Sequence, residues 1–356
     1  MNEWEKIRSE IDKIDESLVR LLNKRAKNGQ KIAELKSKIG SPVFLPAREN
    51  EILKKVSGLN RGPLSGKALQ NVFREIFSAT RSVEQAIRVS CLGPEGTFSH
   101  LASRRIFGES CEYLLEPGID TVFHSVEKGS AHFGVVPLEN TIEGTVGITH
   151  DMLMESDVRI YGELYFDIHQ NLLSKAKDLT KITTLYTHPM PLAQSRSWVA
   201  RNLPGVKIID TSSTSEAARL AAGSKDSAAI GAAEAAKIYG LNVLGKKIED
   251  TKGNQTRFFV ISLDKSPRSG NDKTSVICAI SDAVGALNNI LRPFSTKGLN
   301  LSKIQSRPKR NAEWEYVFYI DFDGHEDDPD VKSVLKKIEK QAVFLKTLGS
   351  YPNARV

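Results

Sequence analysis

Residues 252–260 read Lys-Gly-Asn-Gln-Thr-Arg-Phe-Phe-Val, a polar turn that runs directly into an apolar segment typical of a β-strand. A hydroxyl on Thr256 and a permanent cation on Arg257 therefore stand at the mouth of a predicted strand. Open α/β sheets bind their ligands at such strand mouths. An ordinary loop-to-strand junction with a salt bridge at the strand end has the same local sequence. The remaining sequence is therefore needed to distinguish a ligand-binding site from such a junction.

Composition narrows the class of protein. The 356 residues suffice for about two to four domains, and 40% apolar and 26% charged residues are typical of a soluble globular chain. No apolar run approaches the roughly 20 residues of a membrane span, and the first five residues do not resemble a secretory signal. Three isolated cysteines, Cys91, Cys111 and Cys278, predict a reducing cytoplasm.

The spacing of possible metal ligands and the distribution of charge limit the kinds of ligand that the protein is expected to bind. Neither the cysteines nor the seven histidines show metal-ligand spacing, so we expect no metal and no cofactor. The net charge of +7 is dispersed, with Lys and Arg interleaved among 43 acidic residues. This pattern favours small anionic ligands over nucleic acid or a membrane surface.

A long helix opens the chain. Apolar residues follow a 4-3-4-3 spacing at Ile7, Ile11, Ile14, Leu18, Leu21 and Leu22. The pattern continues until Gly40-Ser41-Pro42 ends it, which gives a helix of about 55 Å. Two further helices are predicted near Pro46–Val56 and Pro63–Arg88. Because so short a segment cannot bury so long a stripe, we expect an all-α intertwined dimer.

The positions of the basic residues around this helix decide which of them can share a binding pocket. Arg25 and Lys36 lie about 20° apart around the helix axis, on one face. Arg8 lies about 100° away from Arg25 and more than roughly 20 Å along the axis. Only a partner subunit's Arg8 could share a pocket with Arg25. Solvated helix charges remain the alternative.

The set Arg8, Asp15, Arg25, Lys36, Arg48-Glu49 and Glu84 resembles the all-helical chorismate mutase domain, over the whole of residues 1–88. Such enzymes need no nucleophile, because they hold the dianion chorismate in its compact conformer and stabilise charge on the breaking ether. The resemblance implies that Arg25 and a partner's Arg8 bind the two carboxylates and that Lys36 donates to the ether oxygen. It also implies that Glu49 holds the ring hydroxyl, with Arg48 and Thr80 lining the pocket.

Two positions depart from the commonest mutase pattern. Leu45 stands where an Asp is frequent, and it serves equally if that contact is made by the backbone N–H. Glu84 stands where a Gln often donates to the ether oxygen. An ionised carboxylate cannot donate, so Glu84 has to stay protonated, with a pKa raised by burial. Mutase activity is therefore predicted to fall with rising pH.

Residues 89–265 carry four polar clusters, each at a predicted strand-to-helix turn: 93–100, 139–141, 187–194 and 210–215. The strand before the second cluster is predicted to end at Pro137. Hydroxyl-rich turns are common as helix caps, which is the alternative. If the four converge with Thr256, they form a polar anion pocket in a two-lobed α/β protein.

These segments together resemble prephenate dehydratase, with a two-lobed fold like that of periplasmic binding proteins. The matching stretches are Gly93–His100, Val136–Gly144, Thr187–Gln194, Ser213–Ala218, Ala229–Gly240 and Asn254–Phe258.

The reaction of that family explains the residue types. Prephenate loses CO2 and water together, and the difficult step is the departure of hydroxide. By resemblance Thr256 donates to the leaving oxygen. Arg257 either binds a carboxylate or braces its strand, and Glu139 is either a general acid or orients Asn140. The implied substrate contacts are Thr97, Ser99, Glu139, Asn140, Thr141, Thr187, Gln194, Ser213, Thr214, Thr256, Arg257 and Phe258.

After a linker at 266–272, the predicted order strand-helix-strand-strand-helix-strand is that of a ferredoxin-like α+β module. Gly285-Ala286-Leu287 and Gln305-Ser306-Arg307-Pro308 resemble the two motifs of an ACT regulatory domain, with Gln305 in place of a more usual Glu. The implied ligand is phenylalanine, and a ligand-free dimerisation module is the alternative. The implied effector contacts are Gly285, Ala286, Leu287, Asn300, Leu301, Gln305, Ser306, Arg307 and Pro308.

The sequence therefore predicts a cytoplasmic bifunctional chorismate mutase/prephenate dehydratase under feedback by phenylalanine. We expect a mutase domain at 1–88, a dehydratase domain at 89–265 and an ACT domain at 274–351. The homodimer is expected, and its pairing into tetramers is left open. A catalytically inactive sensor, using the cleft and the ACT domain to regulate a partner, is the alternative.

Overall fold

The computed structural model describes residues 2–39, 42–308 and 316–354. It divides into two compact units, Met1–Arg88 with Phe107–Glu112, and Val89–Ile106 with Tyr113–Val356. Among the described residues, no helix combines the length and apolarity that a membrane crossing requires.

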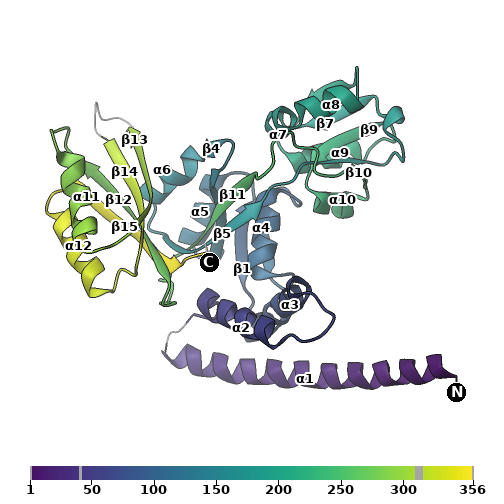
Figure 1. The fold of residues 1–356 in the computed structure, drawn as a ribbon, viewed down its shortest axis with the longest axis horizontal. Coiled ribbons are helices and arrows are strands. Elements are labelled where there is room, and N and C mark those ends of the chain that lie inside the picture. The colour runs from purple at the N-terminus through teal and green to yellow at the C-terminus, as the bar shows by residue number, and fades with distance from the viewer. Residues whose placement is uncertain (1, 40–41, 309–315, 355–356) are drawn as a thin grey trace. The chain divides into compact units, whose positions relative to one another are not determined.

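The first unit is built on three helices, as predicted: α1 (Glu3–Ile39), α2 (Pro46–Leu59) and α3 (Gly66–Glu84) (Figure 1). The predicted stop of the first helix falls on Gly40 and Ser41, which lie outside the described residues. Helix α3 is shorter than expected at both ends. Ser65 caps its start by accepting a hydrogen bond from the Ala68 N–H, and Arg88 already belongs to a strand.

The apolar stripe of α1 is uncovered along its N-terminal half. Five of its residues are 50–58% exposed: Ile7, Ile11, Ile14, Leu18 and Leu21. Farther along, Gly29 packs closely against α3, where a Cβ atom would lie 2.6 Å from Thr80 Cγ2 and 2.7 Å from Glu84 Oε1. This glycine costs helix propensity but lets the two helices approach.

The second unit begins with a two-lobed region, and the first lobe is a sheet with strand order β2-β1-β3-β11-β5 and β4 paired to β3. Its strands are β1 (Arg88–Leu92), β2 (Glu112–Glu116), β3 (Phe133–Asn140), β4 (Gly144–Thr145), β5 (Arg159–Asp167) and β11 (Gln255–Ser262). Its helices are α4 (Phe98–Phe107), α5 (Ile119–Glu127) and α6 (Gly147–Glu155).

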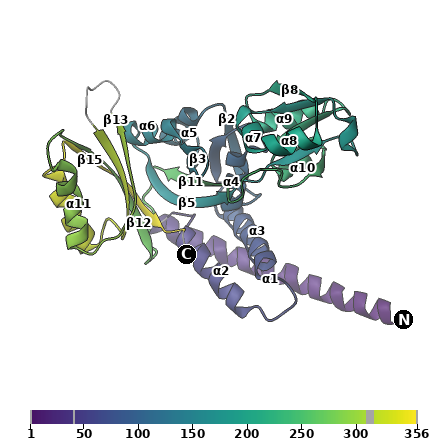
Figure 2. The same cartoon turned by 45° about the horizontal axis from the view of Figure 1, so that its top comes forward.

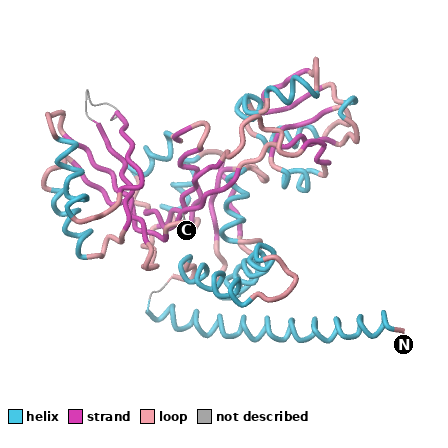
Figure 3. Tube along the Cα trace, in the orientation of Figure 1, coloured by secondary structure: helices cyan, strands magenta, loops and turns pink. Residues whose placement is uncertain are grey.

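The second lobe has its own sheet, with strand order β10-β6-β9-β7-β8. The chain passes between the lobes twice, from β5 into β6 and from β10 into β11 (Figure 3), so the predicted two-lobed α/β architecture is confirmed. The strands are β6 (Asn171–Ser174), β7 (Thr184–Thr187), β8 (Lys207–Asp210), β9 (Ser227–Gly231) and β10 (Asn242–Gly245). The helices are η1 (Leu179–Lys181), α7 (Pro189–Gln194), α8 (Arg196–Asn202), α9 (Thr214–Ala221) and α10 (Ala233–Tyr239).

Two strands of the first lobe extend beyond their predicted ends. Strand β3 was expected to end at Pro137, but it continues to Asn140 because β4 and β11 both pair with its last residues. Thr256 and Arg257 lie inside β11 rather than in a turn, between β3 and β5. Successive side chains of a strand point to opposite faces, so these two neighbours face different surroundings.

The C-terminal module has the predicted ferredoxin-like order, and its four strands form one antiparallel sheet, β13-β14-β12-β15. Both helices pack on one face of that sheet (Figure 2), and the other face shares a hydrophobic core with the first lobe. The elements are β12 (Asp272–Ile280), α11 (Ala286–Thr296), β13 (Leu301–Pro308), β14 (Tyr316–Asp323), α12 (Pro329–Glu339) and β15 (Phe344–Pro352).

Candidate active and effector sites

In the helical unit, α1 and α3 contribute charged side chains to one hollow of about 480 Å³, whose lining includes Lys36, Val43 and Glu84. Lys36 Nζ donates to the Val43 carbonyl at 3.5 Å. Arg25 Nη1 donates to Thr80 Oγ1 at 2.6 Å, which ties α1 to α3. Of the predicted set, Lys36 and Glu84 line the hollow, and the bonded pair of Arg25 and Thr80 lies close enough for the charge of Arg25 to act on Glu84.

Burial changes the ionisation of both carboxyl groups here. Burial raises the pKa of Glu84, against the opposing charges of Lys36, Arg81 and Arg25. Burial also raises the pKa of Glu49, against the charge and hydrogen bond of Arg81. Both shifts favour the protonated acid, which can donate a hydrogen bond where a carboxylate cannot.

Arg81 is a residue that the sequence analysis missed. Its side chain is 5% exposed, it donates to Glu49, and its Nη2 donates to the Phe107 carbonyl at 2.6 Å. The guanidinium also lies 5.2 Å from the centre of the Phe44 ring. Its position one helical turn after the buried Phe77 is a signal in the sequence, because that spacing places a cation on the buried face of α3.

Other predicted residues of this set lie apart from the hollow. Arg8 is exposed and stacks on the Trp4 ring at 4.7 Å, about 25 Å along the axis from Arg25. Arg48 is exposed and pairs with Glu51 at 2.5 Å. Leu45 caps α2 through its backbone, accepting from the Glu49 N–H at 3.1 Å.

In the two-lobed region, Thr256 is held by amide side chains. Asn140 Nδ2 donates to Thr256 Oγ1 at 2.8 Å and to Asn254 Oδ1 at 2.7 Å. Asn140 Oδ1 accepts hydrogen bonds from the backbone N–H groups of Ile142 and Glu143, which fixes the orientation of the side-chain amide. The bond from Asn140 uses a lone pair of the Thr256 hydroxyl, so the Thr256 hydrogen can be directed to another acceptor.

Gln194 links the second lobe to this group. Its Nε2 donates to Glu143 of the first lobe at 2.8 Å, and its Oε1 accepts from Asn254 at 3.2 Å and from Gln170 at 3.1 Å. Burial raises the pKa of Glu143, partly offset by the charge of His188. Glu143 and Asn254 stood inside quoted motifs but were not chosen as site residues.

Several predicted hydroxyls serve as helix caps or brace loops, which was the alternative left open. Thr97 donates to the Leu92 carbonyl at 2.7 Å, and Ser213 caps α9 by accepting from the Glu216 N–H at 3.1 Å. The buried Thr187 donates to the His188 carbonyl at 3.0 Å. The same clusters contribute the exposed Thr141, the buried Ser99 and Thr214 at the start of α9.

Two predicted residues face away from Thr256. Arg257 is buried and donates to Glu163 of the first lobe and to Asp321 of the C-terminal module. Glu139 accepts from Lys303 and pairs with Arg257 at 3.5 Å. Burial acts to raise the pKa of Glu139, but Lys303 and Arg257 outweigh it and the pKa is lowered, so this carboxyl is ionised. This geometry favours bracing by Arg257 and disfavours acid catalysis by Glu139.

Phe258 also belongs to the interior. Its side chain is buried and packs edge-to-face against Phe166, with ring centres 6.4 Å apart. It supports the sheet beneath Thr256.

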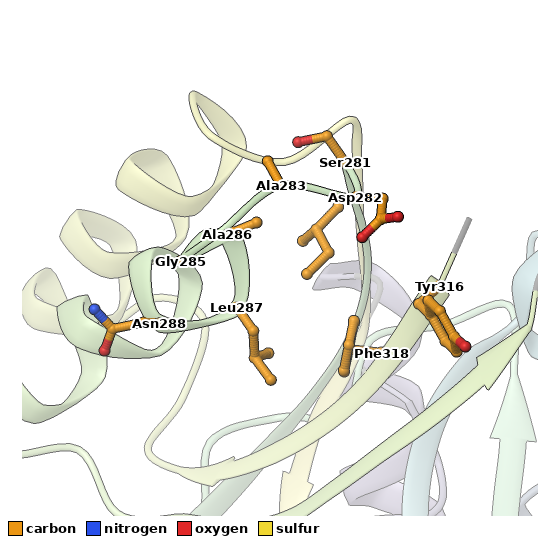
Figure 4. Close-up of a pocket in the computed structure, with 10 residues that line it drawn as sticks. Ser281, Asp282, Ala283, Gly285, Ala286, Leu287, Asn288, Tyr316 and Phe318 are labelled. Atoms are coloured by element: carbon orange, nitrogen blue, oxygen red, sulfur yellow. The ribbon is translucent and has the colours of Figure 1, made fainter. Parts of the chain in front are cut away.

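The C-terminal module has a hollow of about 250 Å³ beside the start of α11, lined by Gly285, Ala286, Leu287, Tyr316 and Phe318 among others (Figure 4). Gly285 has φ of 81°, a left-handed conformation that glycine adopts without strain. Ser306 and Pro308 pair in register with Phe318 and Tyr316, so they belong to the same end of the sheet.

Other predicted effector residues contact the first lobe instead. Gln305 Nε2 donates to Thr145 Oγ1 at 2.6 Å, and Arg307 Nη1 donates to the Gly147 carbonyl at 2.6 Å. Asn300 donates to Asp323 at 3.0 Å, next to Leu301 at the start of β13. The side chain of Pro308 is outside what the structure describes. Within the described residues, no group of acidic, His and Cys side chains is arranged to hold a metal ion.

Three family models match the chain in sequence. Chorismate mutase type II matches residues 7–85, prephenate dehydratase matches residues 89–266, and the ACT domain matches residues 274–340.

Curated relatives match at full length. The bifunctional chorismate mutase/prephenate dehydratase of Aquifex aeolicus (strain VF5) is 43% identical, over 99% of both chains. That of Stutzerimonas stutzeri is 42% identical, over 98% of this chain and 97% of the relative. A solved prephenate dehydratase from Arthrobacter aurescens, in complex with L-Phe, is 34% identical with a TM-score of 0.69, over 75% of this chain and 90% of that chain.

Proposed function

This chain belongs to the family of bifunctional chorismate mutase/prephenate dehydratases, and we propose that three segments divide the two activities and their regulation. Residues 1–88 form the mutase, residues 89–265 the dehydratase and residues 274–351 the phenylalanine-sensing module. The observation that carries this assignment is the full-length relationship at 43% identity.

The mutase reaction needs positive charge and hydrogen-bond donors around a dianion. Arg25 binds one carboxylate of chorismate, and the partner subunit's Arg8 binds the other. Lys36 and protonated Glu84 donate to the ether oxygen, where negative charge grows as the bond breaks. Glu49 holds the ring hydroxyl and is itself held by Arg81. The grouping of Lys36 and Glu84 at one hollow supports these roles.

The dehydratase reaction depends on neutral donors. Thr256 donates its hydroxyl hydrogen to the departing hydroxyl of prephenate while the ring carboxylate leaves as CO2. Asn140 holds Thr256 from behind, and Gln194 and Asn254 line the same region. Backbone N–H groups at the start of α4 bind a substrate carboxylate. No step requires a metal or cofactor.

Phenylalanine binds at the hollow beside α11. The N–H groups at the start of this helix hold its carboxylate, and Leu287 and Phe318 contact its ring. The hollow at Gly285–Asn288 and the L-Phe complex of the Arthrobacter relative support this site.

The chain acts as a homodimer through α1. Its exposed apolar stripe, 50–58% exposed at five positions, supports pairing with a second copy, which also brings the partner subunit's Arg8 to the mutase hollow. We place the enzyme in the cytoplasm, since its three cysteines are unpaired thiols.

Formation of phenylpyruvate by the purified protein tests the assignment, with chorismate and prephenate as separate substrates and with or without phenylalanine. We expect product from both, suppressed by phenylalanine. Product from prephenate alone would remove the mutase assignment, and product from neither would favour the inactive sensor.

A further inference from the structure

Strand β11 carries the dehydratase hydroxyl and a buried cation on adjacent residues. Thr256 accepts from Asn140, and the next residue, Arg257, points to the opposite face, where it meets the ACT sheet. The paired strand β3 repeats this arrangement, because Asn140 lies opposite Thr256 and Glu139 opposite Arg257. The register of this pairing shifts directly after Arg257, and such irregularities change the direction of the side chains around them.

The guanidinium of Arg257 is bonded to both domains. Its Nε donates to Glu163 on β5 at 2.8 Å. Its Nη1 donates to Asp321 on β14 at 2.6 Å, and its Nη2 donates to the Tyr351 hydroxyl on β15 at 3.1 Å. The side chain is 2% exposed, so these bonds leave little room for water. Two of its partners therefore belong to the dehydratase sheet, counting Glu139, and two to the ACT sheet.

The ACT side of this contact is a closed ring of hydrogen bonds. Ser275 Oγ donates to Asp321 Oδ1 at 2.6 Å and lies 2.6 Å from the Tyr351 hydroxyl. Because Ser275 gives its hydrogen to Asp321, Tyr351 has to donate to Ser275 while it accepts from Arg257. A displacement of Asp321 would break the ring and leave a buried guanidinium partly unpaired, which is costly.

The other charged side chains around Arg257 are also paired with groups of opposite charge. Lys273 pairs with Glu163 at 2.7 Å, and Lys303 pairs with Glu139. Three cations thus face three carboxylates across the domain boundary. Because these charges pair with one another, a movement of the ACT sheet would change the hydrogen bonds of Arg257, and water would not replace them.

Strand β14 connects this cluster to the effector hollow. Phe318 lines the hollow, and Asp321 lies three residues later on the opposite face of the same strand. Strand β13 joins the same contact, since Lys303, Gln305 and Arg307 alternate toward the dehydratase. Any displacement of β14 would therefore act directly on Arg257 through Asp321.

We propose that Arg257 is a positioning residue that transmits the state of the ACT domain to Thr256 through Asp321, and that it does not bind substrate. This deepens the proposed dehydratase function and rests on it. Loosening the Asp321 bond shifts β11 and moves the Thr256 hydroxyl relative to Asn140. Turnover changes in consequence, while substrate affinity does not.

The test uses the full-length protein and the variant Asp321→Asn, which keeps the side-chain volume and removes the charge. Dehydratase kcat should fall about tenfold with KM within twofold, and the phenylalanine concentration for half-inhibition should change at least fivefold. Mutase turnover should stay constant, and a circular dichroism spectrum equal to that of the parent protein should show that the variant is folded. Arg257→Lys should give the same split between kcat and KM.

Glu326→Gln is the matched control. Glu326 bridges the same two domains through Arg159, at 2.7 Å, but it does not belong to the Arg257 cluster. It should leave dehydratase kcat and phenylalanine response within twofold of the parent.

Three results would overturn the proposal. The first is an Asp321→Asn variant that matches the parent protein in kcat and phenylalanine response. The second is a Glu326→Gln variant that reproduces the effects of Asp321→Asn, which indicates general loosening. Alternatively, Arg257→Lys raises KM at unchanged kcat, which makes Arg257 a substrate ligand. Absence of dehydratase activity in the parent protein would instead refute the proposed function itself.

Discussion

In the mutase hollow the charged side chains stand at the proposed substrate position, whereas in the dehydratase the charges lie behind the strands. Lys36 and Glu84 line the mutase hollow directly. Thr256 accepts a hydrogen bond from the neutral amide of Asn140, which also donates to Asn254, and the neighbouring Arg257 points to the ACT sheet. The mutase should therefore respond to pH and to its partner subunit, and the dehydratase to its regulatory domain.

The largest expected effect concerns the dehydratase site, where the proposed hydrogen-bond donor is neutral. Thr256→Val removes the hydroxyl while keeping the volume, and dehydratase kcat should fall by about 10²–10³-fold, as for loss of one preorganised donor. Mutase turnover should not change, because the hydroxyl belongs to the other unit. Phenylpyruvate from prephenate and prephenate from chorismate measure the two activities.

Thr183→Val is the control for that substitution. Thr183 is an exposed threonine bonded to Asp226, and its replacement should leave both activities unchanged. Dehydratase activity retained in Thr256→Val would show that the donor lies elsewhere in the cleft.

The next effect tests whether the charged site is shared between subunits. Arg8→Ala and Arg25→Ala should each lower mutase kcat/KM by roughly 10–100-fold, the value of a charge-assisted bond to a carboxylate. Co-expression of the two variants should restore about one quarter of the parent activity, since a mixed dimer contains one intact site.

The complementation has a clear contrary outcome. If both arginines act within one chain, each mixed dimer contains two damaged sites and no activity returns. The mutase hollow would then be complete in a single subunit.

The pH profile of mutase activity tests whether this site, unlike the dehydratase site, depends on the ionisation of a carboxyl group. Glu84 donates only when protonated, and burial raises its pKa, so mutase activity is present below that pKa and is lost as the pH rises through it. The loss should approach about tenfold per pH unit above the pKa. Glu84→Gln should flatten the profile, because an amide donates at every pH.

Glu75→Gln, on the same helix beside the Glu109 N–H, should keep the parent profile. Identical profiles for the parent and Glu84→Gln would exclude Glu84 as the donor.

The smallest effect concerns the packing of the charged site. Gly29→Ala adds a methyl group within 2.6 Å of Thr80 and 2.7 Å of Glu84, and it should lower the free energy of unfolding of the mutase unit by about 1–2 kcal/mol. Gly58→Ala, in α2 and with open space around it, should raise that free energy by up to about 1 kcal/mol. Denaturant unfolding followed by circular dichroism measures both.

Equal stabilisation by the two substitutions would show that α1 and α3 are not in close contact at Gly29. The mutase site would then not depend on close packing of α1 against α3.

Much of the fold was predictable because it depends on short-range patterns. The apolar spacing from Ile7 to Leu22 indicated a helix too long for its own unit, and α1 has that length and exposes that stripe. The order of elements in the C-terminal module followed from strand and helix periodicity alone. Strand ends were less accurate, since β3 reaches Asn140 only because β4 and β11 pair with it.

By itself, the sequence determined which elements form, in what order, and which chemical groups are available, because propensity, periodicity and motif spacing act over a few residues. The tertiary structure alone decided which face of a strand meets which partner. Glu139, Arg257 and Gln305 stood in motifs expected to bind ligands, yet each contacts the other domain. Alternation along a strand offers two faces, and only packing against a sheet formed by distant residues decides which face receives a ligand.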